Sequence, residues 1–178
     1  LRPSFISNAN APSEYHLGHK HPDPADEQFM VLQRALTRLM HGEIPSVGWH
    51  WEQASIYGSD AVTAPELKAA LPHMYFWLDY SGVPGITVRE ANDEVKKAAT
   101  LAALQAAVES IPAYVELSAL MLVLTPVCEH GDNGEVCDYP TWRSRGWCRM
   151  ELAAAFLACN DVRIIVSKGI GHNPFFIY

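Results

Sequence analysis

Three stretches of the chain carry apolar residues at the spacing of an amphipathic helix, and they cover residues 26–42, 88–110 and 147–160. Asp26 can cap the first of these helices, which ends at a glycine. Pro112 kinks or restarts the second helix, and its apolar face continues beyond that proline. The pattern therefore predicts three main helices.

Short runs that are almost wholly apolar alternate with these helices and predict buried strands over residues 74–78, 120–124 and 162–166. Strands and helices thus follow one another in turn along the chain. This order predicts an α/β fold with three layers, α/β/α, in which helices cover both faces of a parallel sheet through right-handed crossovers.

The length of 178 residues suits one domain with a hydrophobic core. We expect residues 1–178 to form that single domain, with three less regular parts. Residues 1–26 are an irregular N-terminal segment, and residues 43–73 are a long insertion with a short helical candidate over residues 65–71. Residues 167–178 are a loop-like tail.

Composition excludes several classes of protein. Hydrophobic residues make up 49% and charged residues 19%, which is typical of a globular domain. The formal net charge of −7 gives a nucleic-acid partner no electrostatic support. No apolar run reaches the roughly 20 residues of a membrane span, so we expect no transmembrane segment.

The N-terminus lacks the basic start and apolar run of a signal peptide. We therefore expect a protein that is soluble in the cytoplasm or in an organelle. Because the chain begins at Leu1 and not at Met, the sequence does not decide whether a targeting segment lies upstream.

Four cysteines in the last third of the chain do not make a disulfide scaffold, so a reducing compartment is expected. Cys128, His130 and Cys137 could ligate zinc with Cys148 as a fourth ligand, but their spacing is not a usual zinc motif. We expect no metal site and interpret the segment as a hairpin-like loop. A Cys128–Cys137 disulfide is the alternative in an oxidising compartment. The three histidines of residues 16–21 are interpreted as a solvated loop.

Residues 142–152 gather two tryptophans, three arginines, a cysteine and a carboxylate just before an apolar helical run. At helical spacing one face is shared by Cys148, Leu152, Ala155 and Cys159, which suits packing against the sheet. Glu151 falls at the edge of that face, near the helix start, where the helix dipole favours an ionised carboxylate.

Two interpretations of Glu151 follow. The carboxylate could stabilise a developing cation or hold the hydroxyl groups of a ribose. Alternatively, it forms a structural ion pair with Arg145 or Arg149. The residue pattern alone favours the ion pair.

The stretch Ser144-Arg145-Gly146-Trp147-Cys148-Arg149-Met150-Glu151-Leu152 resembles the Ser-x-x-Trp-Cys-x-x-Glu-Leu signature of Toll/interleukin-1 receptor (TIR) domains. It follows a buried strand, as in that family. Residues 75–84 are similar to a motif of fungal heterokaryon-incompatibility domains, a TIR-like group, and the likeness extends to TIR-like proteins of algal and protist type. The resemblance covers residues 75–166. It implies a flavodoxin-like TIR topology with a shortened or missing first and last strand.

The resemblance also implies roles for single residues. In TIR domains that cleave NAD, the glutamate of the signature is catalytic, which would be Glu151 here, and its negative charge suits an oxocarbenium-like transition state. NAD would be the substrate, and no cofactor is required. The residues expected to shape the nucleotide-binding pocket are Asp79, Tyr80, Ser81, Trp142, Ser144 and Trp147.

Two departures from the family shift the balance away from an enzyme. Residues 4–8 are the only candidate for the first strand, and the chain ends soon after residue 166. We therefore expect a TIR-like protein-interaction, signalling or assembly module, acting by self-association or as a subunit of a larger complex. The alternative is an NAD nucleosidase that uses Glu151.

Overall fold

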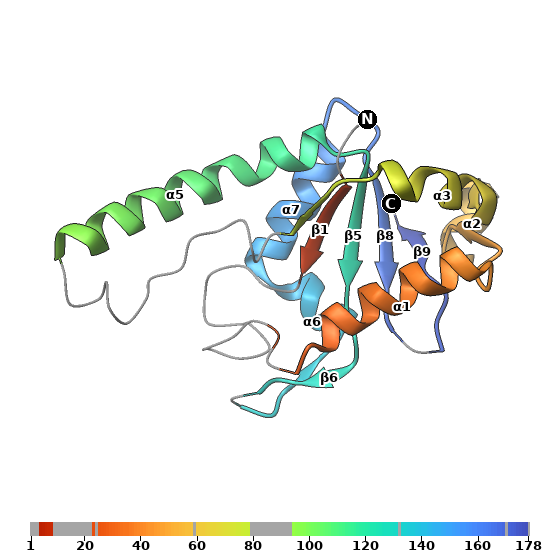
Figure 1. The fold of residues 1–178 in the computed structure, drawn as a ribbon, viewed down its shortest axis with the longest axis horizontal. Helices are drawn as coiled ribbons and strands as arrows, with labels where there is room; N and C mark the ends of the chain where they lie inside the picture. Colours follow the sequence, from red (N-terminus) through yellow and green to blue (C-terminus); the bar gives the residue numbers. More distant parts are fainter. Residues whose placement is uncertain are drawn as a thin grey trace.

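The residues that the structure describes fold around a five-stranded sheet with the order β4-β1-β5-β8-β9 (Figure 1). The computed structural model describes residues 4–8, 23, 25–58, 60–78, 94–131, 133–169 and 171–177. The strands are β1 (Ser4–Asn8), β4 (Phe76–Leu78), β5 (Leu120–Leu124), β8 (Arg163–Ser167) and β9 (Phe175–Ile177). The first four run parallel, and β9 pairs antiparallel with β8. The predicted α/β class is confirmed.

Alternate side chains of the central strands enter two separate hydrophobic cores. The helices that cover these cores are α1 (Glu27–His41), α5 (Glu94–Leu117) and α7 (Gly146–Leu157). Met121 and Val123 of β5 pack with residues of α5 and α7, whereas Leu122 and Leu124 pack with residues of α1. This period of two is expected where both faces of a strand are buried.

The predicted strand over residues 74–78 is shorter and less buried than its sequence suggests. It becomes β4, which covers only Phe76–Leu78 and lies at the edge of the sheet beside β1. Tyr75 is 69% exposed and Phe76 is 37% exposed. An apolar run that predicts a buried strand can equally form an edge strand, because the run says nothing about the number of neighbouring strands.

The tail contains a strand, so the prediction of a loop over residues 167–178 and of a wholly parallel sheet is wrong there. Gly169 and Gly171 have φ values of 98° and 82°, which glycine adopts without the penalty that a Cβ brings. This short turn leads the chain straight back, and a short connection can join only antiparallel strands. Phe176 then faces the core that α1 covers and is 3% exposed.

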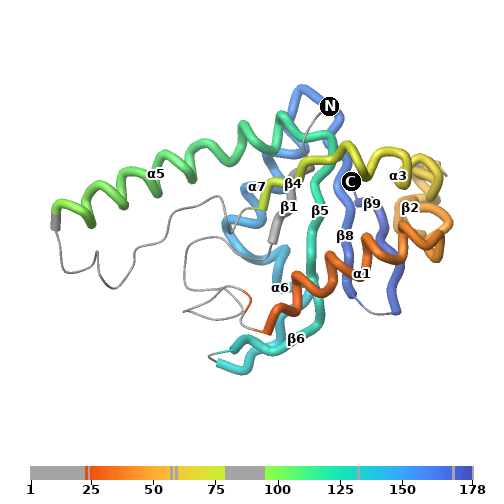
Figure 2. Tube along the Cα trace, in the orientation of Figure 1, coloured from red at the N-terminus to blue at the C-terminus, as the bar shows by residue number. Residues whose placement is uncertain are grey.

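Helix α5 differs from its predicted form at both ends. It continues to Leu117, and it passes Pro112 without a break, so the predicted restart at Pro112 is wrong. Ile111 and Val115 on either side of the proline are 0% exposed, and their packing holds this turn in place. Residues 88–93 lie outside the described residues. Figure 2 shows that the N-terminal half of α5 extends away from the sheet.

Of the helices in the described part of the chain, one is long and apolar enough to span a membrane. It covers Val95–Leu117 of α5 and qualifies by length and composition only. The absence of a transmembrane segment stays a prediction.

The first turn of α1 is capped by a different aspartate from the one that the sequence suggests. Asp26 stands at the N-cap position with φ of 55° and makes no capping hydrogen bond with its side chain. Instead, Oδ2 of Asp23 accepts hydrogen bonds from the backbone N–H groups of Gln28 and Phe29, each at 3.0 Å. The prediction that Asp26 caps this helix is wrong.

The insertion over residues 43–73 is more regular than predicted. Its elements are β2 (Ser46–Gly48), α2 (Trp51–Tyr57), β3 (Ala61–Thr63), α3 (Ala64–Ala70) and a 3-10 turn, η1 (Leu71–His73). Helix α3 confirms the predicted short helix. Ile44 and Val47 are almost fully buried with residues of α1, so the insertion forms part of the core.

Candidate functional site

The signature stretch folds as two consecutive helices. The first, α6 (Tyr139–Ser144), starts with a capping box: the N–H of Thr141 donates to Oδ1 of Asp138 at 2.9 Å, and the N–H of Asp138 donates to Oγ1 of Thr141 at 2.8 Å. Pro140 at the start of the helix suits its first turn. These local interactions fix the direction in which the chain enters the signature.

Arg145 separates the two helices. Its φ of −76° and ψ of 137° are extended, and it is both the C-cap residue of α6 and the N-cap residue of α7. Its N–H donates to the carbonyl of Trp142 at 3.2 Å, and its own carbonyl accepts from the N–H of Arg149 at 3.0 Å. One extended residue therefore turns α7 away from the axis of α6.

Glu151 lies within the buried stripe of α7, not at its edge. Cys148 is 2% exposed, Glu151 1% and Ala155 5%, and the three recur at helical spacing. Leu152 is half-buried and Cys159 is exposed beyond the end of the helix, so the predicted packing face is wrong at Cys159. A carboxylate this far from water interacts strongly with any charge that reaches it.

Glu151 lies midway along α7, which runs from the carboxyl ends of the strands back toward their amino ends. The chain leaves β5 at its carboxyl end and forms α6, and α7 then leads back to the amino end of β8 (Figure 1). Strand β1 lies between β4 and β5, so the chain crosses the sheet in opposite directions on the two sides of β1. Open α/β sheets bind ligands outside the carboxyl ends of their strands at such a switch point.

The predicted pocket residues occupy unlike environments. Trp142 is 0% exposed in the core cluster and stacks on Tyr139 with ring centroids 5.8 Å apart. Ser144 is exposed, and its hydroxyl donates to the carbonyl of Thr141 at 2.7 Å. Trp147 is half-buried. Their role in binding a nucleotide stays a prediction, and the burial of Trp142 favours packing.

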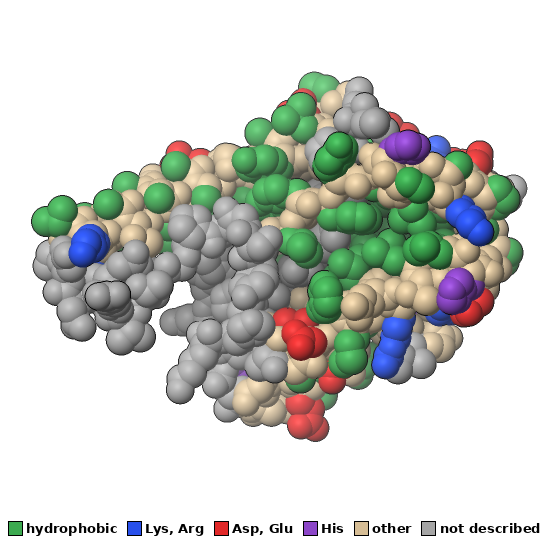
Figure 3. Space-filling view, viewed as in Figure 1, with side chains coloured by type: hydrophobic (Ala, Val, Ile, Leu, Met, Phe, Trp, Pro, Cys, Tyr) green, Lys and Arg blue, Asp and Glu red, His purple; other side chains and the backbone are tan. Residues whose placement is uncertain are grey.

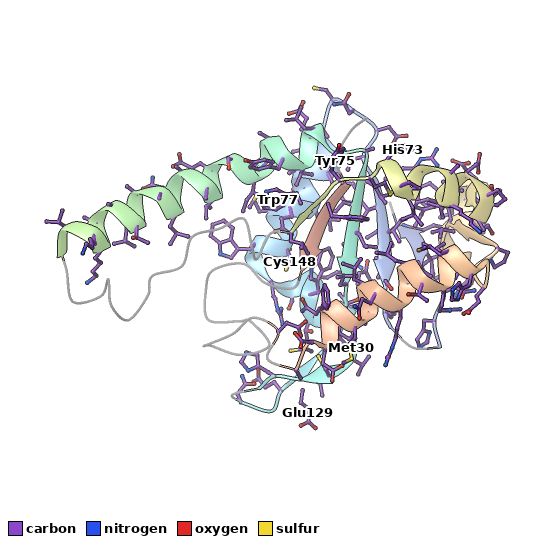
Figure 4. All side chains as sticks on the ribbon, viewed as in Figure 1. Met30, His73, Tyr75, Trp77, Glu129 and Cys148 are labelled. Carbon is purple, nitrogen blue, oxygen red and sulfur yellow. The ribbon has the colours of Figure 1, made fainter. Side chains whose placement is uncertain are left out.

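The loop residues Asp79, Tyr80 and Ser81 lie outside the described residues. The last described part of that segment is β4, where Trp77 packs against the same core cluster that holds Cys148 (Figure 4). Strand β4 thus packs on the same core as the buried stripe of α7.

A pair of thiols lies near the carboxyl end of β5, on a hairpin formed by β6 (Cys128–Glu129) and β7 (Val136–Cys137). Cys128 and Cys137 stand directly opposite each other, and both are free thiols. Nη2 of Arg145 lies 3.5 Å from Sγ of Cys137 and donates to it. This contact joins the hairpin to the residue that separates α6 from α7.

Burial is the main cause that raises the pKa of the Cys128 thiol to about 12, with smaller increases from Cys137, Glu27 and Asp23 and a lowering by Arg145. The thiol is therefore protonated at neutral pH and is a poor nucleophile and metal ligand. No group of three or more metal-ligating side chains forms among the described residues. The hairpin-like loop that the sequence predicts is confirmed, and its two cysteines face each other as free thiols, not as a disulfide.

Comparison with known proteins gives no relative. No protein-family model, curated protein or solved structure matches this chain. The likeness of residues 144–152 to the TIR signature thus stays a prediction.

Proposed function

We propose that the protein is a TIR-like interaction module that self-associates through helix α5. The order of the parallel strands, β4-β1-β5-β8, supports the family assignment. It corresponds to the flavodoxin-like order, in which the second strand of the sheet along the chain, here β4, lies outside the first strand, β1. With helices on both faces, this arrangement would be a three-layer α/β/α fold. The signature helix α7 lies between β5 and β8, as the resemblance implies.

The apolar stripe of α5 carries the proposal. Its members, at steps of three and four residues as in a coiled-coil seam, are Leu101, Leu104, Val108, Ile111 and Val115. Ile111 and Val115 are 0% exposed in the core, whereas Leu101 is 45% exposed. Figure 3 shows apolar side chains along the part of α5 that extends past the sheet. The stripe thus continues beyond the core that buries its C-terminal half.

A second copy of the same helix fits this stripe. Two copies of α5 packed antiparallel, centred between Ala102 and Ala103, would bring Leu101 of one copy beside Leu104 of the other. The same register would bring Lys96 near Glu109 of the partner helix, so opposite charges would meet at the rim of the contact. The small alanines at the centre would allow the helices to approach closely.

Sedimentation velocity over a range of protein concentrations tests self-association. We expect a concentration-dependent dimer, and we expect Leu101→Glu and Leu104→Glu to shift it to monomer because each places a charge in the seam. Leu157→Glu is the matched control, since Leu157 is 83% exposed at the end of α7. A chain that stays monomeric at all concentrations, or a dimer that Leu101→Glu leaves intact, contradicts the proposal.

A second candidate function is cleavage of NAD with Glu151 as the catalytic carboxylate. The position of β1 favours this function, because the sequence left the first strand of the TIR-like sheet in doubt. Strand β1 lies in the sheet between β4 and β5, where that first strand is expected. The buried Glu151 would then act in a setting of low polarity that strengthens its effect on a developing cation.

Release of nicotinamide from NAD tests this second function, with Glu151→Ala and Glu151→Gln as variants. We expect both variants to lose release if the enzyme hypothesis holds, while circular dichroism shows that the fold is kept. Release that is undetectable in the parent chain, or equal in the variants, excludes Glu151 catalysis.

A further inference from the structure

A separate cavity of about 360 Å³ lies beside β9, among residues of α2, α6 and α7. Leu152, Phe156 and Ile177 form its apolar side, and Tyr139, Arg143 and Lys168 form its cationic side. Known small-molecule pockets measure about 300–1,000 Å³, so this cavity suits a small ligand. Neither Glu151 nor the residues of the α5 stripe line it.

Two cations of the cavity are held against aromatic rings. Nζ of Lys168 lies 5.3 Å from the ring centroids of both Tyr139 and Phe175. Cζ of Arg143 lies 5.9 Å from the ring centroid of Tyr139. Such cation–π contacts restrict the rotamers of long side chains, so less entropy is lost when a ligand binds to them.

Neither cation is paired with a carboxylate of the described residues. Within the described part of the chain, neither Arg143 nor Lys168 forms an ion pair, and their contacts are to the aromatic rings. Glu52 also lines the cavity, with its carboxylate 3.7 Å from Nδ1 of His50 and a side chain that is 66% exposed, so it largely faces solvent. In a chain of net charge −7, two cations that meet at one tyrosine and have no ion-pair partner among the described residues form a local site for an anion.

We propose that this cavity binds a small phosphate monoester, with its phosphate on Arg143 and Lys168 and its body against Leu152 and Phe156. A phosphate monoester carries about −1.5 to −2 charges at neutral pH, which matches two cations better than the single charge of a carboxylate. The planar guanidinium suits phosphate oxygens in a bidentate contact, and the ammonium adds a point charge. The apolar wall favours an aromatic or aliphatic body over a bare phosphate.

Tyr139 adds a hydrogen-bond donor to the same end of the cavity. Burial raises the pKa of its phenol above the usual value, and Arg143 opposes this in part. The hydroxyl therefore stays protonated at neutral pH and can donate to a phosphate oxygen.

Isothermal titration with phenyl phosphate tests the site. Inorganic phosphate and phenol, the two halves of that ligand, are titrated separately for comparison. We expect saturable binding of one phenyl phosphate per chain and much weaker binding of either half. Arg143→Gln and Lys168→Gln should each weaken binding at least about tenfold, the loss expected for one charged hydrogen bond. Arg34→Gln is the matched control, because Arg34 is an exposed arginine on α1, outside this cavity.

Thermal unfolding of each variant separates lost binding from lost structure. Weakening by Arg143→Gln and Lys168→Gln, with unchanged unfolding temperatures and no effect of Arg34→Gln, supports the site. Absence of saturable binding, or equal weakening in all three variants, overturns it. The outcome is independent of dimerisation and of NAD cleavage, since neither involves the residues that line this cavity.

Discussion

Trp77 and Tyr114 stack with ring centroids 4.9 Å apart and ring planes 16° apart. The contact joins β4, the edge strand of the sheet, to the C-terminal part of α5. Because the N-terminal part of α5 extends away from the sheet, this stack and the buried residues Ile111 and Val115 set the direction in which the helix leaves the domain.

A double-mutant cycle measures the strength of that stack. Trp77→Leu and Tyr114→Leu keep apolar bulk but remove the ring contact. We expect a coupling energy of about 0.5–1.5 kcal/mol from urea unfolding of the two single variants and the double variant. Additive effects would show that the two rings stabilise the fold independently.

Removal of the side chain of Asp23 should destabilise the start of α1. The carboxylate accepts two backbone hydrogen bonds there, so we expect Asp23→Ala to lower the free energy of unfolding by about 1–2 kcal/mol. Asp26→Ala is the control, because Asp26 makes no capping hydrogen bond. Equal losses in the two variants, measured by chemical denaturation, would contradict this assignment of the cap.

The two aspartates show where sequence patterns lose precision. Periodicity located α1, α3, β5, β8 and the signature helix, because each buries a regular set of apolar positions. The pattern did not identify Asp23 as the cap, since this depends on the path of the chain before the helix. It also did not identify β9, whose three residues pair with β8 only because two glycines turn the chain.

Substitutions of Trp142 should separate its volume from its indole N–H. The ring is fully buried, and its Nε1 has no hydrogen-bond acceptor among the described residues. We expect Trp142→Ala to cost about 3–5 kcal/mol. Trp142→Phe should cost less than about 2 kcal/mol, because it also removes a buried donor whose burial is itself unfavourable. A larger loss for Trp142→Phe than for Trp142→Ala, measured by thermal unfolding, would exclude this account.

Alkylation rates should report the protonated state of Cys128. With a pKa of about 12, roughly one thiol in ten thousand is ionised at pH 8. The ionised fraction grows as pH rises, so we expect the rate of reaction with iodoacetamide to increase about tenfold per pH unit between pH 7 and 10. Mass spectrometry of peptides containing Cys128 gives that rate, with the exposed Cys159 as the accessible reference.

A substitution at Glu27 tests whether its carboxylate helps to raise the pKa of Cys128. Its carboxylate raises the pKa of Cys128, so Glu27→Gln should speed the reaction at a given pH. Asp26→Asn is the control for a neighbouring charge. A rate that levels off below pH 10 in the parent chain would show that the thiol ionises more readily than its surroundings suggest.

The candidate site was only partly accessible from the sequence. The signature residues stood out because aromatic, cationic and acidic residues are dense in one stretch, but the pattern placed Glu151 at the edge of a face that in fact buries it. Lys168 and Phe175 gave no signal at all. Lys168 follows β8 and contacts the rings of both Tyr139 and Phe175, a tertiary arrangement that no local spacing encodes.

Strand β9 has a further consequence for how copies of the chain can meet. On one side Phe176 pairs with Ile165, and on the other its carbonyl accepts the N–H of His50 at 3.2 Å beside a bridge to Trp49. The insertion therefore occupies hydrogen-bonding groups that a foreign strand would need. Growth of the sheet into a continuous cross-chain ribbon is blocked on this side, which protects the protein from edge-to-edge aggregation there.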